Sequence, residues 1–262
     1  MQSHNKLRAK FAAGKKCLGV WGSVLDTIYT ETLATAGYDF IILDNEHGPS
    51  APRETLQHLQ LLDALNVASI VRVPWNDQVY IKRILDAGAE SVMVPMVETV
   101  EQAKAVVAAC RYPPQGQRSF GPWRHAGLVR DIDAWWKGAN DRLFVIVQIE
   151  SAKAVANVDA IAAVEGVDGL FIGPNDLSGS MGRLRDYENP EFLKLVDKHG
   201  LPEVMGAAKT LLPYGSMTQA AERFKALFNG VAGISMRNGL FEIPLAVKCT
   251  ARLMPADGTP DE

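Results

Sequence analysis

Cysteine is scarce in this sequence, and no cysteine pattern indicates a structural role. Cys17, Cys110 and Cys249 are an odd number without CxxC or Cys/His spacing, which argues against a disulfide framework or a zinc site. An excess of one charge is also lacking, since 27 Lys and Arg residues stand against 30 Asp and Glu, a net charge of −3. That balance argues against sequence-independent binding to nucleic acid or to an acidic membrane. A small-molecule ligand is therefore expected.

Export and membrane signals are lacking as well. The first 16 residues carry several Lys and Arg residues but no apolar run of roughly 7 to 15 residues, which a secretory signal requires. No later segment reaches the roughly 18 uninterrupted apolar residues of a membrane span. We therefore expect a soluble, cytosolic protein.

No Pro-, Gly- or Ser-rich linker divides the 262 residues, of which 47% are hydrophobic, so one domain covering residues 1–262 is expected. Short apolar runs alternate with amphipathic runs, which indicates strands and helices in turn. Most of the apolar runs are continuous, as in parallel strands that are buried on both faces. The expected strands are 17–22, 39–43, 68–73, 91–95, 143–149, 169–172, one within 204–214, and 231–235.

The amphipathic runs between these strands predict helices. Gly37 and Gly88 follow two of the runs, at the position where glycine commonly ends a helix. Eight strand–helix units without a dinucleotide-type Gly-rich turn after the first strand favour a (β/α)8 TIM barrel over a doubly wound sheet. The expected helices are 25–36, 52–65, 78–87, 100–110, 152–163 and 218–228.

Two stretches interrupt this alternation. Residues 111–140 form a long, Trp-rich connection, which is interpreted either as a lid over a site or as a packed surface excursion. Residues 191–214 contain prolines that disfavour both a continuous helix and a central strand.

Polar residues gather where the predicted strands end, which is where a barrel carries its active site. Asp44 and His47 follow the second strand, Arg72 ends the third, Glu150 follows the fifth and Asp176 follows the sixth. Each residue alone has an ordinary structural explanation, such as a helix cap or an ion pair. Because so many charges converge on one face, together they predict a site.

The residue types at these strand ends favour enolate chemistry. Glu150 and Asp176 offer oxygen ligands of the kind that Mg²⁺ or Mn²⁺ prefers. Arg72 can stabilise a carboxylate or enolate oxygen, and His47 can transfer protons near neutral pH. Trp21, at the end of the first strand, is either a barrel plug or a wall of the ligand site.

Several motifs resemble those of the HpcH/HpaI aldolases, metal-dependent class II pyruvate aldolases. The resemblance covers most of residues 17–182, in order and at the family's spacing. The matching stretches are DFIILDNEH at 39–47, LDAGAESVMVPMV at 85–97, RYPPQGQRSFG at 111–121, QIES at 148–151 and GVDGLFIGPNDL at 166–177.

The resemblance implies a role for each matching residue. Glu150 and Asp176 would bind a divalent metal ion (Mg²⁺, Mn²⁺ or Co²⁺), with Gln148 beside them. Pyruvate would chelate that ion through its keto oxygen and its carboxylate. The remaining implied roles are a base at His47 that Asp44 and Asp86 orient, enolate stabilisation by Arg72, and carboxylate binding around Gly173, Pro174 and Asn175.

The predicted function is that of a carbon–carbon lyase, an aldolase that cleaves or makes 4-hydroxy-2-oxo acids from pyruvate and an aldehyde acceptor. A macrophomate-synthase-like enzyme or an oxaloacetate decarboxylase would use the same enolate, and a non-catalytic 2-oxo acid binding protein is a further alternative. The resemblance also implies a homo-hexamer, a trimer of dimers. We therefore expect a C-terminal helix over 240–253 that is exchanged between subunits, although this apolar segment could instead close its own barrel.

Overall fold

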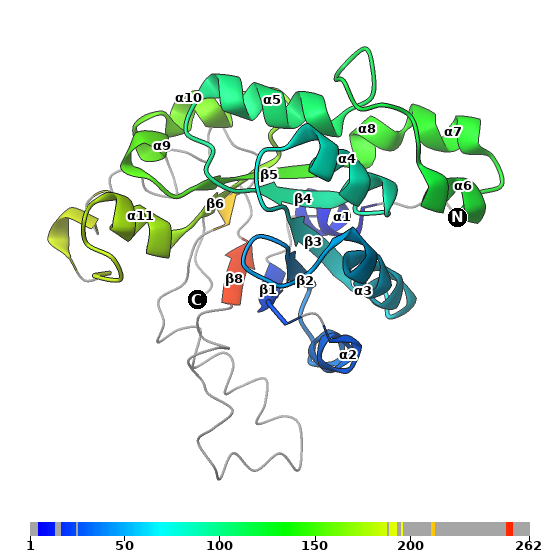
Figure 1. The fold of residues 1–262 in the computed structure, drawn as a ribbon, viewed down its shortest axis with the longest axis horizontal. Helices are drawn as coiled ribbons and strands as arrows, with labels where there is room; N and C mark the ends of the chain where they lie inside the picture. Colours follow the sequence, from blue (N-terminus) through cyan, green and yellow to red (C-terminus); the bar gives the residue numbers. More distant parts are fainter. Residues whose placement is uncertain are drawn as a thin grey trace, which may run out of the picture.

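The computed structural model describes residues 5–13, 17–24, 26–187, 189–192, 195, 211–212 and 250–253. Consecutive strands β1 to β6 pair in parallel and form a curled half-barrel, with helices along its outer side (Figure 1). In the described part of the chain, no helix is both long and apolar enough to cross a membrane.

The parallel strands lie within about one residue of the apolar runs that predicted them. β2 to β5 are almost entirely buried, which explains why their sequences are continuously apolar. The register places Asp44 beside Arg72 at the carboxyl ends of neighbouring strands. The strands are β1 Cys17–Gly22, β2 Phe40–Asp44, β3 Ala68–Arg72, β4 Ser91–Val94, β5 Phe144–Ile149 and β6 Gly169–Ile172.

Side-chain caps define the starts of several helices. Asp26, Asp77, Thr99 and Ser151 each accept a hydrogen bond from a backbone N–H in the first turn of the following helix. The helices are α1 Lys6–Ala12, α2 Thr27–Thr35, α3 Pro52–Ala64, α4 Gln78–Asp86, α5 Val100–Cys110, α6 Trp123–Leu128, α7 Ile132–Lys137, α8 Ala139–Arg142, α9 Ala152–Ala156, α10 Val158–Ala162 and α11 Pro174–Ser180.

The two faces of the sheet bury separate apolar clusters. The larger cluster lies between the sheet and the surrounding helices. The smaller cluster takes residues from all of β1 to β6, including Trp21, Phe40 and Phe171, and fills the concave side. Gly19 is required there, because a Cβ atom at this position would lie 2.1 Å from the Phe40 ring. The inner cluster holds the sheet in its curled form.

The connection over 111–140 contains α6, α7 and part of α8, and it packs as a surface excursion. It follows α5 and leads into β5, so it lies near the amino ends of the strands, opposite the strand ends that carry the predicted site. Tyr112, Trp135 and Ala139 form its small apolar cluster. The lid alternative is therefore wrong for the site of the same chain.

Two further predictions need correction. The helix expected over 152–163 is two short helices, because the chain turns at Asn157, whose amide donates a hydrogen bond to the Glu98 carbonyl oxygen. Thr250–Leu253, expected as the end of a C-terminal helix, is strand β8, which pairs antiparallel with β1. The edge of β1 presents unpaired backbone groups that such a strand satisfies.

Other predictions fall largely beyond the residues that the structure describes. Within the doubtful 204–214 segment, Leu211–Leu212 forms β7, which pairs parallel with β6. The eighth predicted strand at 231–235, the helix at 218–228 and the first part of the 240–253 helix lie outside the described residues.

Candidate active site

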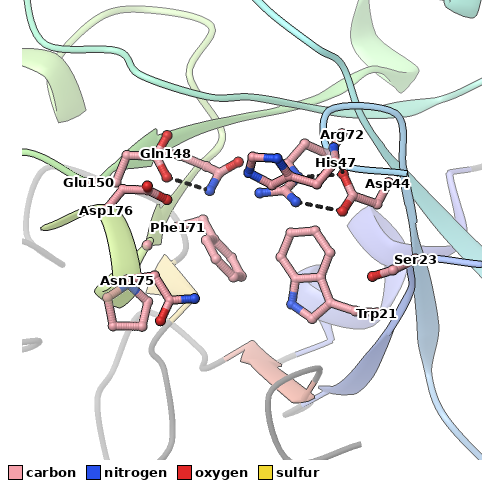
Figure 2. A pocket seen from close by; sticks show the side chains of 12 residues that line it. Trp21, Ser23, Asp44, His47, Arg72, Gln148, Glu150, Phe171, Asn175 and Asp176 are labelled. Atoms are coloured by element: carbon pink, nitrogen blue, oxygen red, sulfur yellow. Dashed lines mark hydrogen bonds and ion pairs between the residues drawn. The ribbon is translucent and has the colours of Figure 1, made fainter. Parts of the chain in front are cut away.

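A cavity of about 230 Å³ lies at the carboxyl ends of the parallel strands. It brings together every predicted site residue except Asp86, and its walls come from β1, β2, β3, β5, β6 and the start of α11 (Figure 2). The lining residues are Trp21, Ser23, Asp44, His47, Arg72, Gln148, Glu150, Phe171, Gly173, Pro174, Asn175 and Asp176.

Arg72 is held rigidly on one side of this cavity. Its Nε and Nη2 atoms donate to the two carboxylate oxygens of Asp44 at 2.9 and 2.6 Å, and its Nη1 atom lies 2.9 Å from Glu46 Oε2. The guanidinium also lies over the Trp21 ring, with Cζ 4.2 Å from the ring centroid. This bidentate, stacked arrangement fixes a buried cation at the cavity wall.

His47 lies in the loop after β2 and its side chain is 67% exposed, so its imidazole can exchange protons with a ligand or with solvent. Asp44 accepts a hydrogen bond from the backbone N–H of His47, at 3.3 Å, and not from the ring. The ring instead faces Glu46, with Nε2 4.0 Å from Oε2. Asp44 therefore contacts the backbone of the loop that carries His47 and not the imidazole that it was predicted to orient.

Glu150 lies on the opposite side of the cavity and is almost completely buried. Its Oε1 atom accepts a 2.7 Å hydrogen bond from the Met96 backbone N–H, and its Oε2 atom accepts a 3.0 Å bond from Gln148 Nε2. The side-chain oxygen of Gln148 is buried and has no hydrogen-bond partner among the described residues. This side of the cavity therefore has one buried oxygen atom without a donor from that part of the chain.

The electrostatics of the two sides differ accordingly. Burial raises the pKa of Glu150 to about 7, and the nearby carboxylates of Glu46 and Asp176 also raise it, against the lowering effect of Arg72 and the Met96 N–H. Burial also raises the pKa of Glu46, although Arg72 and His47 lower it. A positive charge bound beside Glu150 would relieve this carboxylate crowding.

The acidic side fits a hard divalent cation. Glu150 and Asp176 supply carboxylate oxygens, and no described residue donates a hydrogen bond to the buried Gln148 oxygen. Among the described residues, no group of three His, Cys, Asp or Glu side chains is arranged to hold a metal ion. The protein ligands would therefore be two carboxylates, with coordination positions left for small ligands, which is typical of Mg²⁺ and Mn²⁺.

Gly173 leaves room for the Glu150 carboxylate. A Cβ atom at position 173 would lie 2.4 Å from Glu150 Oε2 and 2.8 Å from Glu150 Cβ. Pro174 follows as the first residue of α11, where proline is well tolerated. The Gly-Pro-Asn-Asp sequence thus ends β6 in a turn that brings Asp176 to the cavity.

Asp86 is the predicted site residue that the structure does not place in the cavity. It ends α4, a helix that runs back from β3 toward the start of β4, so it lies near the amino ends of the strands. Its Oδ1 atom accepts a 2.7 Å hydrogen bond from Arg118 Nη2. Within one chain, the prediction that Asp86 orients His47 is wrong.

Sequence reasoning missed three residues of this site. Glu46 pairs with Arg72, and Ser23 and Phe171 line the cavity. Glu46 could have been found from its place in the run Asp44 to His47, where three ionisable side chains follow one strand. Phe171 lies on β6, and its ring packs edge-on against Trp21 at 5.6 Å, so Trp21 is part of both the inner core and the cavity wall.

A curled sheet of parallel strands with a polar, charged cavity at its carboxyl ends is the arrangement of a barrel-type α/β enzyme. Residues 18–223 match the family described as HpcH/HpaI aldolase/citrate lyase. The chain belongs to this family.

Several relatives and solved structures are similar to this chain. The 5-keto-4-deoxy-D-glucarate aldolase of Citrobacter koseri is 41% identical over 192 residues, 73% of this chain and 75% of the relative. A HpcH/HpaI aldolase/citrate lyase family protein from Burkholderia cenocepacia has a TM-score of 0.76 at 34% identity, covering 85% and 89% of the two chains. Macrophomate synthase has a TM-score of 0.68 at 32% identity, covering 79% and 75%. These findings confirm the predicted family and the prediction of an enzyme of the aldolase class.

Proposed function

We propose that this protein is a divalent-metal-dependent aldolase that forms the enolate of pyruvate and joins it to, or releases it from, an aldehyde. One observation carries the proposal. Two acidic oxygen donors, Glu150 and Asp176, face a fixed guanidinium, Arg72, and a solvent-accessible imidazole, His47, around a single cavity. Enolate formation needs both a group that stabilises negative oxygen and a group that moves a proton.

Glu150 and Asp176 are the residues that would hold the cation, with Gln148 turning its amide nitrogen toward Glu150. When bound, a divalent cation such as Mg²⁺, Mn²⁺ or Co²⁺ would polarise the keto group of pyruvate and make its methyl protons more acidic. Burial keeps competing water away from the Glu150 carboxylate, whereas the exposed Asp176 reaches the cavity from solvent. The raised pKa of Glu150 means that loading would be favoured above pH 7, where this carboxyl is ionised.

Arg72 would stabilise the negative charge that develops on the keto oxygen. Because Asp44 and Glu46 already fix its position, no free energy of reorganisation is needed during the reaction. His47 would accept the proton that the substrate loses, a methyl proton when pyruvate forms the enolate. In cleavage, His47 would take the proton of the 4-hydroxyl group. The carbon–carbon bond would then break, the electrons of that bond would form the enolate, and the aldehyde would leave.

The substrate class follows from the relatives and from the composition of the cavity. Relatives about 40% identical are named 5-keto-4-deoxy-D-glucarate aldolase, and the cavity combines polar groups with the aromatic faces of Trp21 and Phe171. We infer that the substrates are hydroxylated 2-oxo acids of this kind. The carboxylate of the 2-oxo acid would bind around Gly173, Pro174 and Asn175.

The test is exchange of the methyl protons of pyruvate with D₂O, followed by NMR, with and without Mn²⁺. Exchange should depend on the metal and should stop after treatment with EDTA. His47→Ala should slow exchange by about 10² to 10⁴ fold, because the proton acceptor is removed, with a smaller effect on pyruvate affinity. Full exchange by the EDTA-treated protein would refute the metal-dependent mechanism. An unchanged exchange rate in His47→Ala would mean that a group other than His47 accepts the proton.

We further infer that the sheet closes into a (β/α)8 barrel. Trp21 on β1 packs against Phe171 on β6, although four strands lie between them in the sheet. The sheet is therefore already curled far enough for its two ends to face each other. β7 extends the β6 edge in parallel, as the seventh strand of such a barrel would, whereas β8 pairs antiparallel with β1 and is therefore not the eighth parallel strand.

We also propose that the protein is a homo-hexamer and that Asp86 serves the site of a neighbouring subunit. Asp86 lies at the far end of the strands from His47 of its own chain, so only a second copy could bring the two together. The connection over 111–140, whose Arg118 binds Asp86, exposes four large apolar side chains, as expected for a face that another subunit covers: Phe120, Trp123, Leu128 and Trp136. Mixed oligomers of the inactive variants Asp86→Ala and His47→Ala should then recover activity, whereas a monomeric mass in light scattering with full activity would refute the assembly.

A further inference from the structure

Asn175 lies at the cavity as part of α11, and its carboxamide has a defined orientation. The side-chain oxygen accepts a short hydrogen bond from the Tyr187 hydroxyl. Figure 2 shows the amide nitrogen of Asn175 directed toward the side of the cavity where Trp21 and Phe171 lie, with the oxygen turned away. The amide therefore presents a donor to the cavity, because its acceptor is already engaged.

Tyr187 does not line the cavity, and it reaches Asn175 through a turn that folds back on α11. The fully buried Ser178 hydroxyl accepts a hydrogen bond from the Arg185 backbone N–H at 2.9 Å and donates to the Asn175 carbonyl oxygen at 2.8 Å. The Arg183 N–H also donates to the Ser178 carbonyl oxygen, at 2.8 Å. The Tyr187 ring packs against Phe192. These contacts fix the position of the tyrosine hydroxyl.

We propose that Tyr187 is a positioning residue that holds the Asn175 carboxamide with its NH₂ group toward the cavity, where it donates to an oxygen of the bound 2-oxo acid. The inference rests on the proposed function. Without the hydroxyl, the Asn175 side chain can rotate about χ2 and turn its carbonyl oxygen toward the cavity, which repels a carboxylate. Tyr187 would then affect substrate binding and not the proton transfer at His47.

The experiment measures KM and kcat for Mn²⁺-dependent exchange of pyruvate methyl protons. Tyr187→Phe should raise KM by about three- to tenfold and leave kcat within about twofold, as expected for one lost hydrogen bond. Asn175→Ala should raise KM by a similar factor or more. In the Asn175→Ala background, Tyr187→Phe should have no further effect, because the group that it positions is absent.

Two more variants separate positioning from a structural effect. Asn175→Asp keeps an acceptor for the Tyr187 hydroxyl but replaces the donor with a carboxylate oxygen, so KM should rise more than in Asn175→Ala. This variant tests the donor role of Asn175 even if Tyr187→Phe does not fold. Tyr112→Phe is the matched control, because the Tyr112 hydroxyl has no hydrogen-bond partner in the described part of the chain and lies away from the cavity. It should leave KM unchanged.

Each outcome bears on a different claim. Suppose that the wild-type protein exchanges protons. If Tyr187→Phe then leaves KM unchanged, or raises KM equally in the wild-type protein and in Asn175→Ala, the positioning role is wrong and the proposed function stands. If Asn175→Asp binds pyruvate as well as wild type, Asn175 is not a donor to the ligand. If the wild-type protein shows no metal-dependent exchange, the proposed function and this inference are both overturned.

Discussion

Replacing Gly173 with alanine would disturb the acidic side of the site without changing any ionisable group. The added Cβ would lie 2.4 Å from Glu150 Oε2 and 2.8 Å from Glu150 Cβ. Rotation of the carboxylate could relieve the first contact, but the Glu150 Cβ atom is fixed to the end of β5. Gly173 has a φ of −94°, so alanine introduces no left-handed strain there, and the effect would be steric.

The size of the effect follows from these distances. Restoring an ordinary contact requires a separation of about 1 Å between the ends of β5 and β6, and misplacing a reacting group by that amount costs about 10²-fold in rate. We therefore expect Gly173→Ala to weaken Mn²⁺ binding and to slow pyruvate proton exchange by roughly 10²-fold. The folded structure should persist, because the separation is needed only at the strand ends and no side chain of the inner or outer cluster is replaced.

The assay combines calorimetric titration with Mn²⁺, proton exchange by NMR and thermal melting. Gly127→Ala is the matched control, since a Cβ there meets nothing within 4 Å, and it should retain full metal affinity and exchange. If Gly173→Ala kept the wild-type Mn²⁺ affinity and exchanged protons within about threefold of wild type, the placement of the cation beside Glu150 would be refuted.

Three other changes should have separable effects. Asp176→Asn should weaken Mn²⁺ binding by about 10²-fold through loss of a charged ligand, and unchanged affinity in calorimetry would remove it from the ligand set. Arg72→Lys should lower kcat by about 10²-fold with little change in Mn²⁺ affinity, because an ammonium cannot reproduce the fork that binds Asp44, and wild-type kcat would contradict this. Burial lowers the pKa of His125 to about 4, so the unfolded chain binds a proton that the folded chain excludes between about pH 4 and 6.5, and stability falls as pH falls through that window. His125→Phe should remove that part of the loss and raise the melting temperature relative to wild type by about 5–10 °C more at pH 4.5 than at pH 7.5, whereas parallel pH profiles would contradict it.

The strands and much of the site could be predicted from the sequence, because both depend on local patterns. The predicted bounds of β1 and β6 match the structure, since continuous apolar runs in this chain are buried strands. Strand ends then locate Arg72, Glu150 and Asp176 at one edge without further information. The break between α9 and α10 was not predictable in this way, because it depends on a hydrogen bond from Asn157 to the distant Glu98.

The roles of Asp86 and Glu46 show the limit of residue patterns. The motif around Asp86 indicates a functional carboxylate, but the direction of α4 carries it away from His47 of the same chain. Glu46 stands one residue from His47, yet its contact with the guanidinium depends on how the loop turns after Asp44. A motif identifies the residue types of a site, while the fold decides which of them meet.

The two sides of the cavity have different hydrogen-bonding states, and this difference explains how the site could work. The charge of Arg72 is balanced by two carboxylates and its guanidinium is stacked on the Trp21 ring, so that side is fixed before any ligand arrives. On the other side, burial raises the pKa of Glu150, and the Gln148 oxygen receives no hydrogen bond from the residues that the structure describes. A bound cation would supply the missing positive charge, so loading the metal and organising the site would be the same event. The guanidinium side would require no such step, so under the proposed function it would stabilise the enolate as soon as the 2-oxo acid binds.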